Sequence, residues 1–171
     1  MKKMIHRLSV LSCGLLAIGL VCACAVSEAT RQERAERLAR LKENISTGLA
    51  ERKFQIDVSQ AHPQGRGRTI HLTSSYSVRV SGDTIVSYLP FFGRAYSVPY
   101  GGGQGLNFTG RIVSYESGVT RKGEHVITMG VESSEDVYVY TVSLFDNGSA
   151  SVGVQPRQRS YIYFTGNYHE E

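Results

Sequence analysis

Residues 138–154 read YVYTVSLFDNGSASVGV, and this stretch decides the fold class. Apolar and polar residues alternate on both sides of Asp146-Asn147-Gly148, which is the pattern of two strands joined by a tight turn. A two-residue Asn-Gly turn would pair Leu144 with Ser151 and place the apolar residues of the two strands on opposite faces. A three-residue loop with Gly148 in a left-handed conformation pairs Leu144 with Ala150 and keeps one face apolar. We therefore predict a β-hairpin with the longer loop.

The same alternation extends outward from this hairpin. Residues 76–80 and 85–89 flank Gly82-Asp83, a second hairpin signal, and pair Val80 with Ile85. Five further segments have the composition of strands: 54–58, 68–72, 106–115, 124–131 and 160–164. Residues 116–123 and 133–136 are predicted to be polar turns. Eight to nine short strands predict a mainly β protein, an antiparallel meander that closes into a barrel or folds into a sandwich, because both architectures hide the sheet edges.

One segment before the strands, residues 27–52, predicts an α-helix. It is rich in Ala, Leu, Glu and Arg, and apolar residues recur at helical spacing at Leu38, Leu41, Ile45 and Leu49. This apolar stripe predicts packing against the β domain. The charged first turns are expected to be solvated, with an arginine contact to an anionic membrane as the alternative. The expected organisation is a lipidated N-terminus and helical stalk over residues 24–52 and a β domain over residues 53–171.

Residues 1–23 have the pattern of a lipoprotein signal peptide. Three basic residues precede an uncharged apolar run, residues 8–21, that is too short to span a bilayer comfortably. The sequence Val21-Cys22-Ala23-Cys24 resembles a bacterial lipobox, in which Cys24 becomes the lipidated first residue; cleavage after Ala25 is the alternative. We expect Cys24 to anchor the protein at the outer membrane, facing the periplasm or the cell surface. The residue after it, Ala25, is not the Asp that resembles an inner-membrane retention signal.

Charge and cysteine content argue against several functions. The 171 residues carry 19 Lys and Arg against 15 Asp and Glu, but residues 24–171 carry only 16 against 15. A nearly neutral chain gives no basis for nucleic acid binding. All three cysteines lie within the first 24 residues, so lipidation of Cys24 leaves the mature chain without a disulfide or a cysteine metal site.

Residues 88–108, YLPFFGRAYSVPYGGGQGLNF, hold six of the 16 aromatic residues and three adjacent glycines. Two interpretations remain open. The aromatic rings plug one end of the barrel or sandwich, or they form a ligand surface that stacks on sugars or apolar groups. The ligand-binding residues of the second interpretation are Phe92, Arg94, Tyr96 and Tyr100. Alternation along an extended chain further predicts that Phe91 is buried and Phe92 is more exposed.

The motif Leu89-Pro-Phe-Phe-Gly-Arg-Ala-Tyr96, followed by Pro99-Tyr100-Gly-Gly and Phe108, resembles the signature of the domain-of-unknown-function 4251 family. These are small secreted or lipidated proteins of Bacteroidetes-type bacteria. The hairpin at 76–83 and the closing Tyr161-x-Tyr163-x-x-Gly166 are also similar to that family, so the resemblance covers about residues 43–168. It implies an antiparallel β fold similar to lipocalin-type barrels. It implies no activity, because the family has no established function.

No motif predicts a catalytic residue, a metal site or a cofactor. The glycine-rich stretch 101–105 lacks the Lys-Ser/Thr of a phosphate loop. The histidines after the signal region form no close pair of the kind that binds metal, and surface positions are expected for them; they are His62, His71, His125 and His169. A Ser/His/Asp triad would have to be assembled by folding.

Two functions from different classes follow from these observations. The first is a lipid-anchored, non-catalytic module of the cell envelope that binds a small apolar or sugar ligand or another envelope protein. The second is a hydrolase of envelope or extracellular polymers built on a β scaffold. The absence of catalytic spacing favours the first. A polar cleft with a perturbed histidine or carboxylate would favour the second.

Overall fold

The computed structural model describes residue 28 and residues 30–65, 68–96 and 105–169. Along its strands, side chains alternate between the two faces of the sheet. Within the described residues, one helix over residues 30–50 precedes eight strands. In chain order the strands are β1 (Lys53–Pro63), β2 (Ile70–Ser81), β3 (Thr84–Leu89), β4 (Leu106–Val119), β5 (His125–Glu132), β6 (Val137–Leu144), β7 (Ser149–Pro156) and β8 (Ile162–Tyr168). The chain divides into two compact units, Met1–Arg40 and Leu41–Glu171, and the second contains all eight strands.

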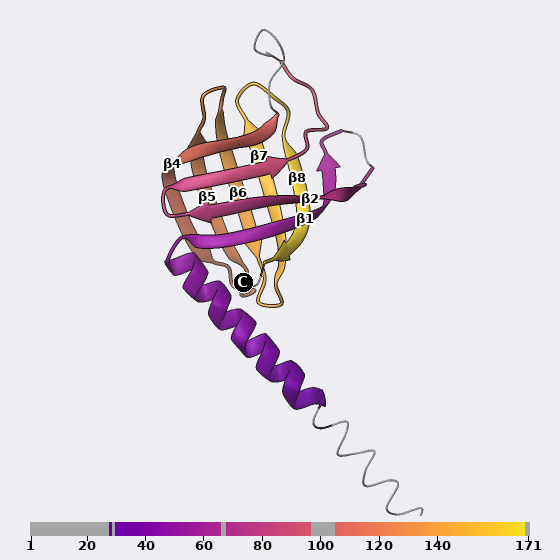
Figure 1. Cartoon of the computed structure of the whole chain (residues 1–171), viewed down its shortest axis with the longest axis vertical. Coiled ribbons are helices and arrows are strands. Elements are labelled where there is room, and N and C mark those ends of the chain that lie inside the picture. The colour runs from indigo at the N-terminus through magenta and orange to yellow at the C-terminus, as the bar shows by residue number, and fades with distance from the viewer. Residues whose placement is uncertain (1–27, 29, 66–67, 97–104, 170–171) are drawn as a thin grey trace, which may run out of the picture. The chain divides into compact units, whose positions relative to one another are not determined.

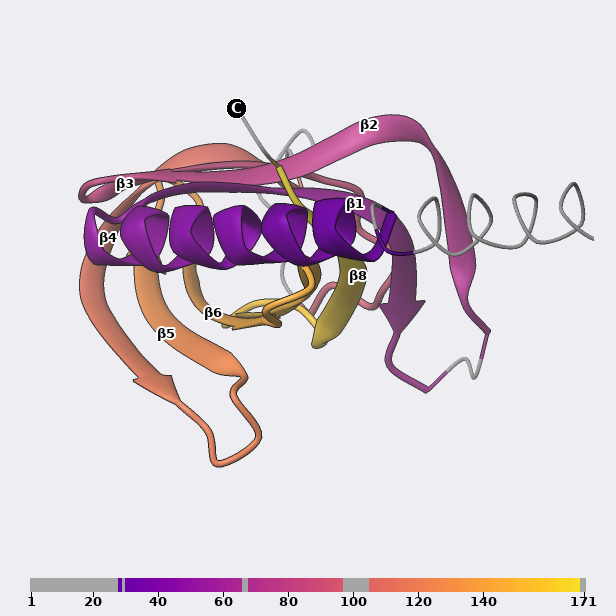
Figure 2. The ribbon, with the colours of Figure 1, turned by 90° about the horizontal axis from the view of Figure 1, so that it is seen from below.

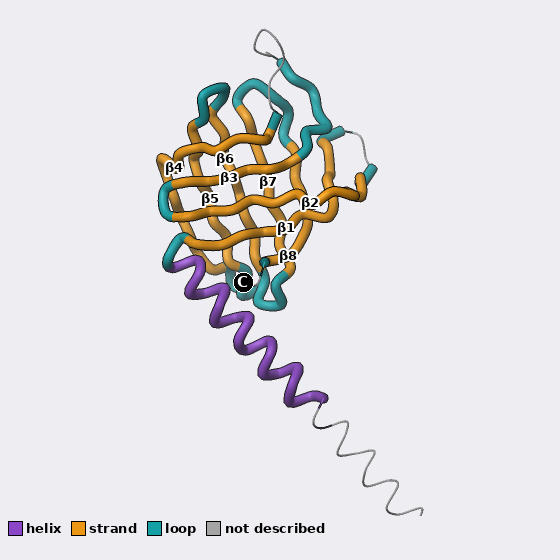
Figure 3. The backbone as a smooth tube through the Cα atoms, in the orientation of Figure 1, coloured by secondary structure: helices purple, strands orange, loops and turns teal. Residues whose placement is uncertain are grey.

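The strands close into an antiparallel barrel in the order β1 to β8 (Figure 1). Each strand pairs with its neighbour in the chain, and β8 pairs back with β1. Loops and turns join consecutive strands at the ends of the barrel (Figure 3). Closure hides the edges that an open sheet of these strands would expose. Of the two architectures that the sequence left open, the barrel is the one that forms.

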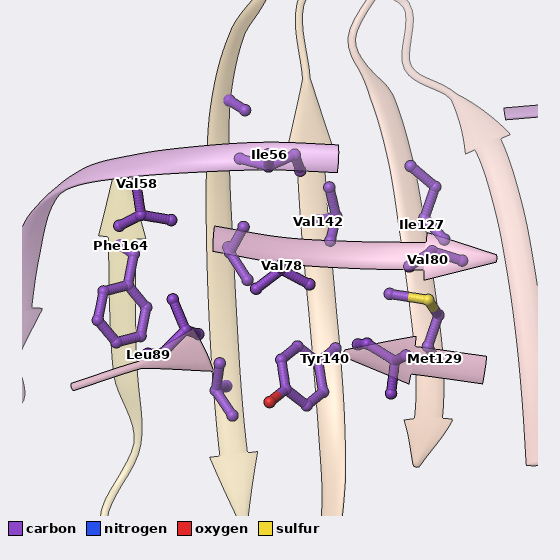
Figure 4. Packing of buried hydrophobic residues seen from close by; sticks show 14 of the residues in the cluster. Ile56, Val58, Val78, Val80, Leu89, Ile127, Met129, Tyr140, Val142 and Phe164 are labelled. Carbon is purple, nitrogen blue, oxygen red and sulfur yellow. The ribbon is translucent and has the colours of Figure 1, made fainter. Parts of the chain in front are cut away.

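Apolar side chains fill the interior. Residues of β1 to β3 meet residues of β5, β6 and β8 across the barrel, with Val78 of β2 and Met129 of β5 among the fully buried ones (Figure 4). An eight-stranded barrel is just wide enough for side chains to fill it. Burial of this much apolar surface is the main source of stability for the domain.

Both predicted hairpins form in the predicted register. Leu144 pairs with Ala150 and Val142 with Val152, as the three-residue loop requires, and Gly148 has a φ of +83°. The backbone N–H of Gly148 donates to the carbonyl of Phe145 over 2.8 Å. In the other hairpin Val80 pairs with Ile85. The choice of register from the apolar face is therefore confirmed.

Two strand predictions differ from the structure. The segments 68–72 and 76–80 contribute to one long strand, β2, because residues 72–75 stay extended although they have no partner in β1. The polar segment 116–123 is only partly a turn. The β4–β5 hairpin continues to the pair Val119–His125 and projects beyond the neighbouring strands (Figure 2).

The last turns of the helix are part of the barrel unit. Ile45 is fully buried, and Leu41 and Leu49 pack against the core. Lys42 Nζ donates to Asp146 Oδ2 over 2.7 Å. Leu38, the first residue of the apolar stripe, is instead exposed. No helix among the described residues is long and apolar enough to cross a membrane.

Candidate functional site

The segment that the sequence singled out lies beside the loop that precedes β8. The backbone N–H of Arg94 donates to Ser160 Oγ over 3.0 Å, and the N–H of Ser160 donates to the carbonyl of Arg94 over 2.9 Å. The side chains of Arg94 and Tyr96 are exposed, and Tyr100 lies outside the described residues. These bonds fix the described backbone as part of the barrel end. The ligand-binding role of Phe92, Arg94, Tyr96 and Tyr100 stays a prediction.

The expected difference between Phe91 and Phe92 does not appear. β3 ends at Leu89, immediately before Pro90, so the strict alternation of an extended strand stops there. Both phenylalanines are half-buried and pack against the core. Phe91 also lies beneath the buried Arg159, whose guanidinium carbon is 5.3 Å from the ring centroid. This arrangement matches the interpretation of the segment as a plug.

The barrel interior contains a hydrogen-bonded polar pair. The Tyr140 hydroxyl donates to Ser87 Oγ over 2.9 Å, and Ser87 Oγ donates to the carbonyl of Leu106 over 2.7 Å. Both side chains are buried, and burial raises the pKa of Tyr140 far above its ordinary value. The described part of the chain has no buried side-chain nitrogen or oxygen without a partner. The polar groups inside the barrel are therefore satisfied by the protein itself.

A cleft of about 460 Å³ lies over the outer face of the barrel, where the end of β1 meets the start of β8. Three of its lining residues carry aromatic rings. His62 of β1 stacks in parallel on Tyr163 of β8, with ring centroids 4.3 Å apart and planes 8° from parallel. The ring of Tyr161 is 6.5 Å from that of Tyr163. We call this site the aromatic cleft; its lining residues are His62, Pro63, Gln64, Gly65, Arg68, Thr69, Tyr161 and Tyr163.

A β-bulge in β1 places His62 on the outer face. The register of β1 shifts between Val58 and Gln60 against both of its neighbouring strands. Before the shift Ile56 and Val58 point inward; after it the inward residues are Ala61 and Pro63. Without the extra residue, His62 would share the inward parity of Ile56. Because of the bulge, the imidazole of His62 points to the surface and not into the core.

Hydroxyl groups contact both nitrogens of the His62 ring. Nε2 lies 3.2 Å from the Thr165 hydroxyl, which also donates to Gln60 Oε1 over 3.4 Å. On the other side of the ring, Nδ1 lies 3.2 Å from the Thr69 hydroxyl. The imidazole is therefore held with both nitrogens engaged.

Burial and a neighbouring histidine favour the neutral form of the His62 imidazole. Burial and then the nearby His71 hold the pKa of His62 below its ordinary value of 6.5. Burial followed by the neighbouring Tyr163 raises the pKa of Tyr161. Arg68 is the one charged residue among the described residues that line the aromatic cleft. The cleft thus combines flat neutral rings with a few polar groups at its border, which is a composition typical of small-ligand sites.

A second and larger cleft, of about 560 Å³, is polar and has a His–Asp pair at its border. Nδ1 of His169 lies 2.7 Å from Asp57 Oδ2. Gln55 Nε2 donates to Asp57 Oδ1, and Arg79 Nε donates to Gln55 Oε1, each over 2.7 Å. These contacts join β1, β2 and the end of the chain in one polar network.

The described residues of this network include a His–Asp pair without a nucleophile beside it. The imidazole of His169 and the carboxylate of Asp57 are both about half exposed. Within the described ranges, no serine, threonine or cysteine side chain is bonded to this imidazole. A nucleophile that a His–Asp pair could activate is therefore not positioned there by the described residues.

Another histidine–carboxylate contact lies at the end of the barrel. Nε2 of His125 is 3.6 Å from Asp146 Oδ1, where Lys42 also contacts that carboxylate. Lys42 and then the neighbouring histidine hold the pKa of Asp146 below its ordinary value. Asp57 pairs with His169, not with His71 on the neighbouring strand. Among the residues that the structure describes, no group of three or more His, Cys, Asp or Glu side chains could hold a metal ion.

Sequence analysis did not identify the aromatic cleft; it predicted only the strand over residues 160–164. The spacing Tyr161-x-Tyr163 indicates that the two tyrosines share a face of the chain at this strand. Nothing in the sequence indicates which face points outward relative to His62, because that depends on the bulge in β1. The site was therefore missed as a unit although its strand was predicted.

Comparison with known proteins gives a family and no activity. The model of the domain of unknown function DUF4251 matches residues 36–168. A crystal structure of a DUF4251 family protein from Bacteroides eggerthii DSM 20697 is similar with a TM-score of 0.55 and 16% sequence identity, over 76% of this chain and 87% of that one. At this identity the likeness concerns the fold alone. No curated protein matches the chain. The match over most of the chain shows that this protein belongs to the DUF4251 family.

Proposed function

We propose that this protein is a lipid-anchored, non-catalytic binding module of the cell envelope, which holds its ligand on the outer face of the barrel. One observation carries the proposal. The interior is filled by side chains that satisfy one another, whereas the aromatic cleft is open and lined by rings fixed in place. A site whose rings are already ordered loses little conformational entropy when a ligand binds.

The anchor is the second part of the proposal. Cys24 stands where a lipobox places its lipidated cysteine, and acyl chains bind a membrane with about 0.8 kcal/mol per buried methylene. We propose the outer membrane as the location, with the barrel facing the periplasm or the cell surface. Binding partners would then be molecules of the envelope.

Hydrogen exchange tests the binding function. The full chain in detergent is incubated separately with the lipid, glycan and protein fractions of the host envelope. We expect one fraction to slow exchange of backbone amides at the end of β1 and the start of β8. Tyr163→Ala should abolish this protection, and Tyr88→Ala, which removes an exposed tyrosine of β3 outside the cleft lining, should preserve it. Protection by no fraction, or equal loss in both variants, would contradict the proposal.

Mass spectrometry of the mature N-terminus tests the anchor. We expect an acylated Cys24, and Cys24→Ser should give unprocessed or released protein. Cys22→Ser is the matched control, because it changes a neighbouring cysteine and leaves the proposed lipidation site intact. A mature chain that starts at Val26 without lipid would exclude the anchor.

A further inference from the structure

We propose that the aromatic cleft binds the pyranose ring of a glycan, which packs its C–H face on the tyrosine rings and reaches the polar border with its hydroxyls. This inference rests on the proposed binding function and names its ligand class. The ring contacts, the polar groups around them and the paired edges of β8 each support it.

The rings form a supported surface. Tyr163 is 40% exposed, and His62 covers one face of it in parallel contact. Thr69 and Thr165 hold His62 by both nitrogens, so His62 acts as a positioning residue for the Tyr163 ring. Aromatic faces carry partial negative charge, which attracts the polarised C–H groups of a sugar ring.

A neighbouring glycine allows Tyr161 to lie close to the sheet. A Cβ added to Gly153 of β7 would come within 2.6 Å of the Tyr161 hydroxyl. The ring therefore lies over the outer face of β7, beside Tyr163. The two tyrosines present hydroxyls as well as faces.

The polar border suits hydroxyl groups. Gln64 contributes an amide, Thr69 a hydroxyl and Arg68 a guanidinium. Amides, hydroxyls and guanidinium groups donate or accept the hydrogen bonds that sugar hydroxyls need. The described lining residues include no carboxylate, so they offer a neutral or acidic sugar a better match than a cationic ligand.

The closed barrel argues against an extended peptide. Peptides that bind to β domains commonly add a strand to a free sheet edge. Beneath the cleft β8 pairs with β1 on one side and with β7 on the other, so the backbone groups of β8 are already paired. A peptide that lies on β8 would have to bind through side chains alone.

Oligosaccharide titration tests this inference. The full chain in detergent is titrated with cellotetraose, chitotetraose and tetragalacturonate, with binding followed by saturation-transfer NMR. We expect at least one of them to bind, with about a tenfold loss of affinity in Tyr163→Ala. Tyr163→Phe keeps the ring and should lose less affinity than Tyr163→Ala, whereas Tyr88→Ala should stay within about twofold of the wild type. His62→Ala should weaken binding because it removes the support of Tyr163.

Two results would overturn the inference. In the first, none of the three oligosaccharides binds at millimolar concentration. In the second, Tyr88→Ala weakens binding as much as Tyr163→Ala, which would show non-specific contact. Circular dichroism of each variant confirms that it is folded. Amide protection by a lipid or protein fraction, with no response to glycans, would overturn the sugar ligand while leaving the binding function in place.

Discussion

The interior of the barrel and its aromatic cleft use the same kinds of side chain for different purposes. Inside, Tyr140 is fully buried and gives its hydroxyl to Ser87. Outside, Tyr163 stacks on His62, whose nitrogens are bonded to Thr69 and Thr165. Both regions are ordered by rings and hydroxyls. The outer one also retains open space beside its rings, about 460 Å³ of it.

This difference separates rings that stabilise the fold from rings that a ligand can reach. A ring that packs in the interior gains stability from burial but offers no surface to a ligand. A ring held at the surface by hydrogen bonds and stacking gains less stability and keeps an exposed face. The two regions should therefore respond differently to substitution: the interior through stability, and the cleft through binding.

The sharpest test compares two adjacent residues of β8. Phe164 is fully buried and Tyr163 is 40% exposed, because neighbouring residues of a strand point to opposite faces. We expect Phe164→Ala to reduce the free energy of unfolding by about 3–5 kcal/mol. Tyr163→Ala should reduce it by less than about 1 kcal/mol. Urea unfolding measures both, and equal losses would remove the distinction between the regions.

A substitution in the loop between β6 and β7 tests how much backbone strain and steric contact this end of the barrel tolerates. Gly148 has a positive φ, and a Cβ there would lie 3.2 Å from Leu41 Cδ2 of the helix. We expect Gly148→Val to cost about 1–2 kcal/mol, since a β-branched residue is strained in this conformation. Thermal unfolding measures the loss, and an unchanged midpoint would contradict the expected strain. Gly123→Val is an informative control: its φ is also positive, but a Cβ there meets nothing within 4 Å, so strain acts without the clash.

Removing one tyrosine hydroxyl in each region compares more finely what the two regions contribute to stability. Tyr140→Phe removes the bond to Ser87 while the ring stays, and we expect a loss of about 1 kcal/mol in the free energy of unfolding. Tyr163→Phe removes a hydroxyl at the exposed cleft and should change that free energy by less than about 0.5 kcal/mol. Urea unfolding of both variants gives the comparison. A larger effect at Tyr163 would mean that its hydroxyl has a structural role.

The smallest expected effect is a pH dependence at the cleft. The folded protein holds the pKa of His62 below 6.5, so the unfolded chain binds the proton more readily. This contribution to stability is fully present above pH 6.5 and is lost as the pH falls through the lower pKa of the folded state. His71 and Arg68 are the other basic groups near this ring among the described residues.

Unfolding midpoints at about pH 7.5 and about pH 5 measure this dependence. Between these values the wild type should lose more stability than His62→Phe, because only the wild type contains the imidazole whose pKa folding lowers. His71→Gln, which removes the second cause of the lowered pKa, should show an intermediate loss. A wild type that loses no more than His62→Phe would show that His62 titrates as in an unfolded chain.

Local patterns in the sequence were sufficient for the strands and hairpin registers. Alternation located the strand regions, and the apolar face selected the three-residue loop at Gly148. Patterns failed where the chain departs from regular pairing. Residues 72–75 of β2, which have no partner in β1, looked like a break between two strands, and the bulge in β1 leaves no mark in composition.

The aromatic cleft shows the same limit. Tyr161 and Tyr163 can be assigned to one face from their spacing, but the contact of Tyr163 with His62 joins strands about a hundred residues apart in the chain. The prediction for Phe91 and Phe92 failed for a related reason: it extended strand alternation past Pro90, where β3 has already ended.

The pairing of β1 with β8 has a consequence for how the chain folds. Ile56 must find Tyr168 and Pro63 must find Ile162, whereas every other strand pairs with its sequence neighbour. Closing such a long loop has a high entropic cost before any contact compensates it, so closure is expected to be the slow step. Until it occurs, the first and last strands expose unpaired backbone to other chains. A chaperone that shields these two strands would therefore protect the folding intermediate more than one that acts on the hairpins between them.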